Sequence, residues 1–180
     1  KCEMNISGEK IILRAISLCD SQLLLDLIND SETEQMLGGS SFPVSLESQN
    51  KWISELENQH GVLRCIVATK DNIDEGLGTV ILSDIDYKNG TAQIHIKMDK
   101  DKGRGKGYGI DAVKAIVSYA FDEMRLNCIY ANILSYNTIS ACLFKKAGFV
   151  LDGVMRSRVF KNGEFIDLHS YSILKDEYNN

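Results

Sequence analysis

The fold is decided by residues 91–124, which read TAQIHIKMDKDKGRGKGYGIDAVKAIVSYAFDEM. The segment Thr91–Met98 is typical of a strand, and a run of glycines separates it from a segment expected to be helical from about Ile110. Apolar residues there recur at spacings of three and four, which predicts one buried stripe, formed by Ile110, Val113, Val117, Ala120 and Met124. The side of the helix expected to face water carries Asp111, Lys114, Ser118 and Asp122.

The glycine-rich turn before this helix predicts an anion-binding site. Its glycines occupy alternate positions, at Gly103, Gly105, Gly107 and Gly109. The first N–H groups of a helix have no intrahelical partners, the helix dipole adds partial positive charge, and missing Cβ atoms let a phosphate approach the backbone. Basic residues gather in or beside the turn although the chain has a net charge of −5; they are Lys97, Lys100, Lys102, Arg104 and Lys106.

Three kinds of phosphate site use a glycine-rich turn of this sort. A Walker loop requires a hydroxyl residue after its lysine, whereas Lys106 is followed by Gly107. A dinucleotide fingerprint requires the spacing G-x-G-x-x-G and a later acidic residue, and the strand expected at Cys128–Leu134 has no carboxylate. The third kind is a cradle for the diphosphate of coenzyme A.

Two motifs carry a family resemblance that agrees with the third kind. Residues 104–109, RGKGYG, closely resemble the (Q/R)-G-x-G-x-(G/A) motif of the GNAT superfamily of acetyl-CoA-dependent N-acetyltransferases. Residues 137–149, NTISACLFKKAGF, are similar to the family's N-x-x-[AS]-x-x-L-Y-x-K-x-G-F. The ending from residue 153, GVMRSRVFKNGEFID, looks like the RimJ/RimL-type branch, which includes spermidine and nucleotide-sugar acetyltransferases.

The order of expected elements agrees with an α/β fold of this family. Strands are expected at Lys10–Arg14, Leu63–Thr69, Leu77–Ile85, Thr91–Met98, Cys128–Leu134, Phe149–Phe160 and Phe165–Leu174. Helices are expected from Asp20 or Ser21 to Asn29, from Ser45, from Ile110, and over Thr138–Ala147. We therefore predict a single domain over residues 1–180, with a mixed, mostly antiparallel sheet of about seven strands flanked by about four helices. Residues 30–44 are predicted to be a loop that contacts substrate.

The resemblance implies where the coenzyme binds. The central strand would splay from the strand that follows the main helix, so that the pantetheine arm pairs with exposed backbone. The Met98 N–H, or one beside it, would polarise the thioester carbonyl, and Asn137 would contact the coenzyme near its pantetheine arm. The full set of expected coenzyme-binding residues is Ile96, Lys97, Met98, Arg104, Gly105, Lys106, Gly107, Tyr108, Gly109 and Asn137. The turn is one residue longer than in many relatives, so its register stays open.

The catalytic residues depart from the family pattern at two positions. Phe144 stands where the family commonly has a proton-donating tyrosine, and Gln93 stands where the branch often has a glutamate. His95 is on the same strand face as Gln93, and its ordinary pKa near ~6.5 suits deprotonation of an amine. The missing acid leaves four replacements open: Tyr136, Tyr108, Cys142 or a solvent molecule.

The acceptor is expected to be a primary amine that attacks directly in a ternary complex. A polyamine, a protein N-terminus or another small amine would suit the acidic residues Asp30, Glu32, Glu34 and Glu47. Two alternatives stay open, an amino-sugar nucleotide as acceptor and a non-catalytic sensor of acyl-CoA. Trp52 is expected to belong to the core.

Composition limits the remaining partners. The five cysteines are scattered, without a C-x-x-C pair, which favours reduced thiols in a cytoplasmic protein over disulfides or a metal site. The net charge of −5 does not favour binding to nucleic acid, which requires a basic surface. The sequence has no apolar run of the ~20 residues that cross a bilayer and no secretion signal, so we expect no membrane partner. A homodimer is compatible with all of these features.

Overall fold

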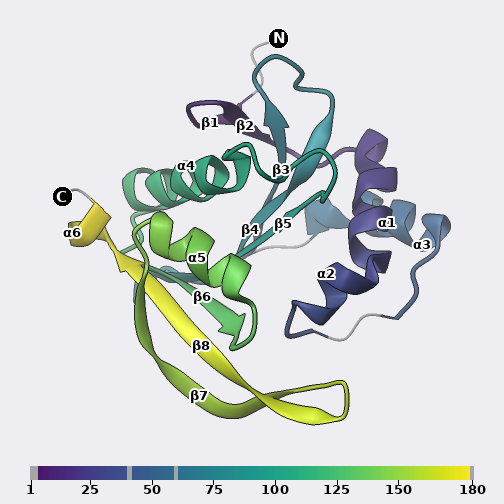
Figure 1. Ribbon diagram of the computed structural model, residues 1–180. Coiled ribbons are helices and arrows are strands. Elements are labelled where there is room, and N and C mark those ends of the chain that lie inside the picture. The colour runs from purple at the N-terminus through teal and green to yellow at the C-terminus, as the bar shows by residue number, and fades with distance from the viewer. Residues whose placement is uncertain (1–3, 40–41, 59–60, 179–180) are drawn as a thin grey trace.

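The computed structural model describes residues 4–39, 42–58 and 61–178 (Figure 1). An open sheet of eight strands forms its centre, in the spatial order β1-β2-β3-β4-β5-β6-β8-β7. The strands are β1 (Ile6–Ser7), β2 (Ile11–Arg14), β3 (Leu63–Thr69), β4 (Gly76–Asp86), β5 (Thr91–Met98), β6 (Cys128–Leu134), β7 (Val150–Lys161) and β8 (Glu164–Leu174). The α/β architecture expected from the sequence is confirmed.

Helices cover both faces of the sheet. They are α1 (Ser21–Asn29), α2 (Ser31–Gln35), α3 (Leu46–Ser54), α4 (Tyr108–Asp122), α5 (Thr138–Lys146) and α6 (Lys175–Tyr178), with 3-10 turns at Leu18–Asp20 and Leu56–Asn58. Figure 1 shows α4 and α5 on the near side of the sheet and α1 to α3 grouped at one side, next to the β4 and β5 strands. The long β7–β8 hairpin extends below α5.

Two hydrophobic clusters lie on opposite faces because strand side chains alternate in direction. Val67 of β3 is fully buried in the larger cluster, which includes most of the apolar residues of α4. Ile66, which precedes Val67 in the chain, is fully buried in a smaller cluster with Leu24 of α1 and Ile53 of α3. Trp52 packs against the smaller cluster, as expected, but it also lines a cavity described below.

The sheet opens in its middle, as the resemblance implied. The β5 and β6 strands run parallel and pair only over Thr91–Gln93 and Cys128–Tyr130. Beyond Gln93 the two strands separate, while β4 stays paired with β5 as far as Met98. The other strand pairs of the described residues are antiparallel. The far half of β5 therefore has one free backbone edge.

Three details of the fold differ from the sequence-based expectation. The two-residue strand β1 brings the sheet to eight strands, and α2 and α6 bring the helices to six, because elements this short leave little periodicity. The predicted loop over residues 30–44 contains α2, whose first turn is capped by the Asp30 carboxylate accepting from the Thr33 N–H. The helix α4 begins at Tyr108, two residues before its predicted start.

Asp111, which was expected to face water, is instead a structural anchor. Its carboxylate accepts the backbone N–H groups of Glu9 at 2.9 Å, Lys10 at 2.7 Å and Ile11 at 3.0 Å. These three donors lie about a hundred positions away in the chain, in the turn between β1 and β2 and at the first residue of β2. The carboxylate therefore fastens that turn to the first turn of α4, which is also the start of the coenzyme-binding helix predicted above.

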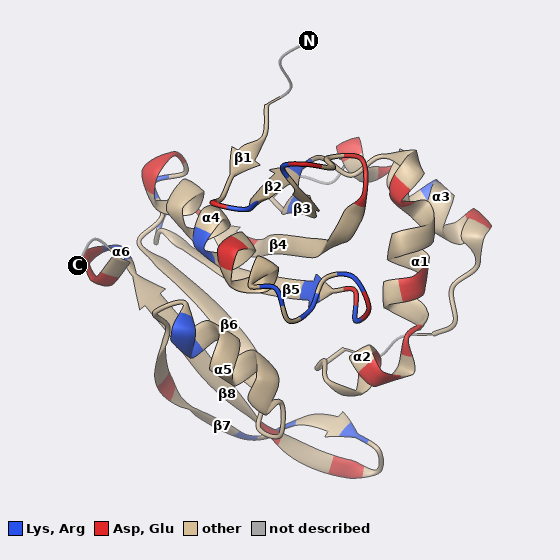
Figure 2. Ribbon diagram, turned by 45° about the horizontal axis from the view of Figure 1, so that its top comes forward, with Lys and Arg blue, Asp and Glu red and all other residues tan. Residues whose placement is uncertain are grey.

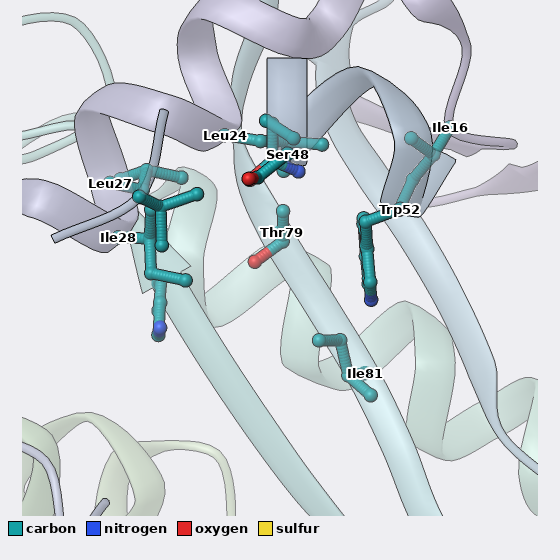
Figure 3. A pocket seen from close by; sticks show the side chains of 11 residues that line it. Ile16, Leu24, Leu27, Ile28, Ser48, Trp52, Thr79 and Ile81 are labelled. Carbon is teal, nitrogen blue, oxygen red and sulfur yellow. The ribbon is translucent and has the colours of Figure 1, made fainter. Parts of the chain in front are cut away.

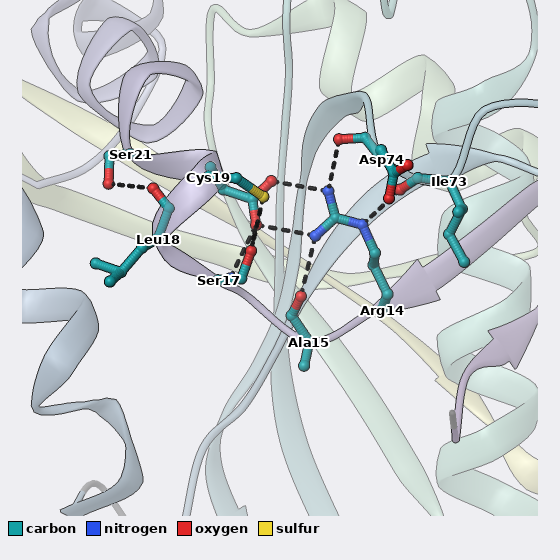
Figure 4. A network of polar contacts seen from close by, with 9 residues as sticks. Arg14, Ala15, Ser17, Leu18, Cys19, Ser21, Ile73 and Asp74 are labelled. Carbon is teal, nitrogen blue, oxygen red and sulfur yellow. Dashed lines mark hydrogen bonds and ion pairs between the residues drawn. The ribbon is translucent and has the colours of Figure 1, made fainter. Parts of the chain in front are cut away.

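A buried ion pair fixes the entry to α1 (Figure 4). Arg14 grips Asp20 with two parallel contacts, Nη1 to Oδ2 at 2.9 Å and Nη2 to Oδ1 at 2.8 Å. Its Nε also donates to the carbonyl of Ile73 at 2.6 Å. Asp20 is 2% exposed and accepts the Ser17 N–H as well. The pair joins β2, the start of α1 and the loop before β4, so it holds α1 beside the sheet.

Candidate active site

The turn between β5 and α4 has the backbone expected of an anion cradle. Gly105 and Gly107 both have φ of +79°, a conformation that side-chain-bearing residues rarely adopt. Gly107 caps α4, and the first intrahelical bond runs from the Asp111 N–H to the Gly107 carbonyl. The preceding N–H groups at the helix start therefore have no intrahelical acceptor. A Cβ on Gly105 would meet no atom within 4 Å, so this side of the turn is open.

At the other two glycines of the turn, Gly103 and Gly109, neighbouring atoms leave little room for a side chain. A Cβ on Gly103 would lie 2.7 Å from the Leu77 carbonyl oxygen, and one on Gly109 would lie 3.0 Å from Leu143 of α5. The Asp99 side chain accepts two N–H groups within the turn, and the Gly103 N–H returns to the Asp99 carbonyl at 2.9 Å. A compact turn over residues 99–103 thus takes up the length between Met98 and the cradle.

Basic residues lie in and beside the turn between β5 and α4 (Figure 2), and the side chains of some are already paired. Lys102 pairs with Glu75 at 2.8 Å and Lys100 pairs with Asp30 at 3.0 Å. Arg104 and Lys106 have no carboxylate within 4.0 Å among the described residues. Lys10 approaches from the β1–β2 turn, with its Nζ 3.8 Å from the position of a Cβ on Gly107. The sequence could not have signalled Lys10, because it lies about a hundred residues away.

The free edge of β5 presents particular backbone groups toward the gap. The Asp99 N–H donates to the Leu77 carbonyl at 2.8 Å, on the β4 side. Because backbone groups alternate along an antiparallel strand, the N–H groups of Met98 and Ile96 point to the opposite edge, where β6 has moved away. Lys97, between them, directs its backbone toward β4, and its side chain lines the cavity on the sheet face.

Asn137 caps α5 and also binds α2. Its Oδ1 accepts the Ser140 N–H at 3.1 Å and its Nδ2 donates to the Met36 carbonyl at 3.0 Å. The neighbouring Tyr136 hydroxyl donates to the Gln35 carbonyl. The C-terminal end of α2 is thereby fastened to the turn that follows β6, on the far side of the gap.

The helix α2 therefore bridges the open middle of the molecule. At its start, Lys100 of the turn between β5 and α4 pairs with Asp30 and with Glu32, the latter at 3.7 Å. Near its end, Lys161 of β7 pairs with Glu34 at 3.0 Å and donates to the Glu34 carbonyl. Three of the four acidic residues expected to attract a cationic acceptor are thus paired with lysines of the same chain.

His95 lies on the face of β5 that carries the Lys97 side chain. Its Nε2 shares a hydrogen bond of 2.8 Å with the Ser83 hydroxyl, and the ring keeps contact with solvent. The pKa of His95 is lowered, chiefly because surrounding protein displaces part of its water; Asp84 raises it and Lys97 lowers it. The ring is therefore neutral at pH 7 and able to accept a proton. Gln93 is on the same face, as expected, next to β6.

Phe144, which stands where the family commonly has a proton-donating tyrosine, lies in the hydrophobic core. The Phe144 ring is 3% exposed and packs edge to face on Phe149, with 5.0 Å between ring centroids. Cys142 is exposed on α5, and Tyr108 is half-buried at the start of α4. Tyr136 is 40% exposed, and its hydroxyl proton is directed at the carbonyl of Gln35.

A cavity of about 360 Å³ lies on the His95 face of the sheet, between α1, α3 and the β4 and β5 strands (Figure 3). The residues that line it are mostly apolar: Ile16, Leu24, Leu27, Ile28, Val44, Ser48, Gln49, Trp52, Thr79, Ile81 and Lys97. Figure 3 shows Trp52 facing Leu27 and Ile28 across the space, with Thr79 and Ile81 between them. Sequence reasoning missed this site because its lining comes from separate elements without a local motif.

Asn132 of β6 is a second residue that the sequence analysis missed. Its Oδ1 is buried and has no hydrogen-bond partner within the part of the chain that the structure describes. Asn132 is two positions beyond Tyr130, which pairs with Gln93, so it is on the His95 face of the sheet. An oxygen in this state can accept a hydrogen bond from a donor group of a bound ligand.

Two other kinds of site can be addressed for residues 4–39, 42–58 and 61–178. No cluster of His, Cys, Asp and Glu there could hold a metal ion. None of the helices in these segments combines the length and apolar character needed to cross a membrane.

The sequence of the chain is similar to those of known acetyltransferases. A family model described as "Acetyltransferase (GNAT) domain" matches residues 10–150. The "Uncharacterized N-acetyltransferase p20" of Bacillus licheniformis is 28% identical over 172 residues, covering 94% of this chain and 96% of that protein. The "Probable N-acetyltransferase YjcK" of Bacillus subtilis is 30% identical over 182 residues, with coverages of 96% and 98%. The "Putative ribosomal N-acetyltransferase YdaF" of the same organism is 29% identical over 182 residues, with coverages of 98% and 96%.

Solved structures share the fold. The spermidine N-acetyltransferase from Vibrio cholerae, in complex with CoA and spermine, superposes with a TM-score of 0.86 at 22% identity and covers 96% of this chain and 100% of that one. A structure described as "Probable acetyltransferase" has a TM-score of 0.84 at 25% identity, with coverages of 97% and 98%. The chain thus shares its fold with a protein that was solved in complex with CoA.

Proposed function

The chain belongs to the GNAT family of N-acetyltransferases, and from this premise we propose that it transfers an acetyl group from acetyl-CoA directly to a primary amine in a ternary complex. The cradle at Gly105 and Gly107 is the observation that carries the proposal. Both residues adopt a left-handed conformation at the mouth of a long helix, beside the free edge of β5. A diphosphate fits this arrangement of open backbone and positive dipole.

The residues expected to hold the coenzyme fit it in two ways. Arg104 and Lys106, which lack carboxylate partners among the described residues, together with Lys10, would neutralise phosphate charge. Ile96 and Met98 would offer backbone groups to the pantetheine amides. Bound acetyl-CoA would supply the thioester that a neutral amine attacks.

The chain's own groups would then serve the transfer. The Met98 N–H is available at the free edge of β5 and would polarise a carbonyl placed there. His95 would take the proton of the incoming amine, directly or through water, since its pKa is lowered and the ring is neutral at pH 7. The rest of the rate enhancement would come from holding the amine and the thioester in reacting positions. Such positioning can lower the reaction barrier by up to ~7–11 kcal/mol.

We propose Tyr136 as the group that donates a proton to the departing thiolate of coenzyme A. Its hydroxyl is already hydrogen-bonded to the Gln35 carbonyl, so it would first release α2. Phe144 cannot take this role because it has no hydroxyl and lies in the core. The acceptor would enter on the His95 face, through the cavity between α1 and α3.

The proposal is tested with the purified full chain in two steps. Calorimetric titration with acetyl-CoA is expected to give saturable binding, and mixing with acetyl-CoA and a panel of amines is expected to release free thiol. Binding without turnover on any amine would favour a sensor. Absence of both heat and thermal stabilisation would refute the coenzyme site and with it the proposed function.

We propose the cytoplasm as the place of action. Cys19 and Cys142 are exposed free thiols, and Cys65 and Cys128 are also unpaired. Thiols in this state are typical of a reducing compartment.

A further inference from the structure

The cavity on the His95 face is built to hold an apolar group. Its volume of about 360 Å³ is within the usual range of small-molecule sites, which begins near ~300 Å³. Leu24, Leu27 and Ile28 form one wall, and the Trp52 ring forms the other. Asn29 holds the mouth in place, since its side chain exchanges two hydrogen bonds, of 2.9 and 3.0 Å, with the backbone of Val44. An apolar group that fills this space would gain stability from leaving water.

Two polar side chains of the lining have no hydrogen-bond partner, and a third, that of Lys97, has no close ion pair. Gln49 and Thr79 are each 5% exposed, and neither side chain has a hydrogen bond to any residue that the structure describes. The Lys97 ammonium has no carboxylate within 4.0 Å in the same set of residues. Asn132 Oδ1 is the one fully buried polar side-chain atom without a partner among the described residues, so the polar atoms of Gln49 and Thr79 face open space in the cavity, where a ligand can bond to them. Their shared position in one apolar cavity points to a ligand that completes them.

The charge of the cavity disfavours a polycation. None of the acidic residues considered for binding a cationic acceptor lines it. Asp30 and Glu32 pair with Lys100, Glu34 pairs with Lys161, and Glu47 is exposed on α3. Among the described residues of the lining, Lys97 alone carries a formal charge, and Glu34 acts on it from outside the lining. A carboxylate or a carbonyl oxygen is the complement of this group.

The cavity also leads to the place of reaction. Thr79 lies directly opposite Lys97 in the β4–β5 register, and Ile81 lies directly opposite His95. Side chains in directly opposite positions lie ~5 Å apart at Cβ. A ligand whose apolar part fills the cavity would therefore place an attached amine beside His95.

We infer that the acceptor is a primary amine whose non-reacting part is apolar, aromatic or branched aliphatic, and carries a carboxylate or carbonyl oxygen that binds Lys97. This inference rests on the function proposed above and names its acceptor class. The apolar part fills the space between Leu27 and Trp52, Thr79 and Gln49 bond to polar atoms of the same ligand, and the amine faces His95. A free amino acid with a large apolar side chain and a peptide that begins with one share this chemistry.

The test uses the fluorescence of Trp52, which is the only tryptophan of the chain and lines the cavity. The full-length protein is titrated, with coenzyme A present, with phenylalanine, phenylalanylglycine, 2-phenylethylamine and spermidine. We expect either of the first two to bind most tightly, which also identifies the free acid or the peptide as the source. Loss of the oxygen in 2-phenylethylamine should weaken binding about tenfold. Tightest binding by spermidine, or no response to any apolar amine, would overturn the inference.

Substitutions separate the polar from the apolar contribution. Lys97→Met should weaken phenylalanine about tenfold and change the affinity for 2-phenylethylamine by less than about twofold, because only the former has an oxygen for the ammonium. Thr79→Val, which keeps the side-chain shape, should weaken phenylalanine about threefold to tenfold. Lys51→Met is the matched control, since Lys51 is a solvent-exposed residue of α3, and should leave both affinities unchanged. Equal effects of Lys97→Met and Lys51→Met would overturn the assignment of Lys97.

The outcome also distinguishes this inference from the proposed function. Acetyl-CoA is titrated calorimetrically into the same preparation. Coenzyme binding and acetylation of spermidine, without binding of apolar amines, would overturn the inference and leave the proposed function standing. Binding of apolar amines with neither coenzyme binding nor turnover would overturn the proposed function.

Discussion

Lys100 and Asp30 join the turn between β5 and α4 to the start of α2, with 3.0 Å between Nζ and Oδ1. The pKa of Asp30 is lowered to about 2, first by the Thr33 hydroxyl that donates to it and then by Lys100. The carboxylate therefore stays charged throughout the pH range in which the enzyme would work. This contact, together with Lys161 at the other end of α2, spans the gap in which the coenzyme and the acceptor would meet.

We predict that loosening α2 weakens acceptor binding. Lys161→Met removes the contacts of a mostly buried ammonium with Glu34. Amide hydrogen exchange over residues 31–36 should accelerate, and the acceptor KM should rise about threefold to tenfold, which corresponds to roughly 1 kcal/mol. The Kd for acetyl-CoA should change less than the acceptor KM does. Lys51→Met serves as the control, and unaltered exchange in α2 would show that Lys161 does not restrain this helix.

The cradle predicts a local defect at Gly107. Replacing Gly107 by valine forces a branched side chain into a backbone with φ of +79° and should abolish coenzyme binding with the fold retained. Gly163→Val is matched to it, since Gly163 has φ of +84° in the β7–β8 hairpin and no atom within 4 Å of an added Cβ. Titration calorimetry and circular dichroism check both variants. Retained affinity in Gly107→Val, or equal loss in Gly163→Val, would count against the cradle.

His95 predicts the pH dependence of the reaction. Its pKa is lowered from the ordinary value, so the neutral base is present above that pKa and kcat/KM should fall as the pH drops through it, below ~6.5. Lys97→Met removes a positive neighbour and should move the inflection to higher pH, whereas Asp84→Asn should move it to lower pH. Rates measured from pH 5 to 9 test this order. An unchanged profile in His95→Ala would remove His95 from the mechanism.

Arg14 and Asp20 predict a stability effect far from the site. Removing the carboxylate in Asp20→Ala leaves a buried guanidinium unpaired and should lower the free energy of unfolding by about 3–5 kcal/mol, measured with urea. Burial raises the pKa of Asp20, but the Arg14 hydrogen bond and charge outweigh this and the net pKa is lowered.

The sign of the acid dependence follows from that lowered pKa. The stabilisation is complete above the unfolded-state pKa near ~3.9 and is lost as the pH falls toward the folded-state value. The difference between the protein and Asp20→Ala should therefore shrink in acid. Asp26→Asn, an exposed carboxylate of α1, is the control and should cost little. A constant difference between pH 7 and pH 2.5 would show that Asp20 does not titrate as described.

The sequence by itself determined the parts of this protein that depend on neighbours in the chain. The strands Thr91–Met98 and Cys128–Leu134 and the helix that begins at Thr138 follow from local periodicity and turn chemistry, and the structure has them all. The same local patterns carry the family motifs, which is why the family could be recognised from the sequence.

The tertiary structure decided what depends on distant segments. It brought the Asp111 carboxylate to the β1–β2 turn, fastened α2 to Lys100 and Lys161, and enclosed Thr79 and Lys97 in an apolar cavity. No spacing in the chain encodes these contacts, because each joins side chains that only packing brings together. The acceptor proposed above depends on this second group of contacts, since a cavity exists only after separate elements have closed around it.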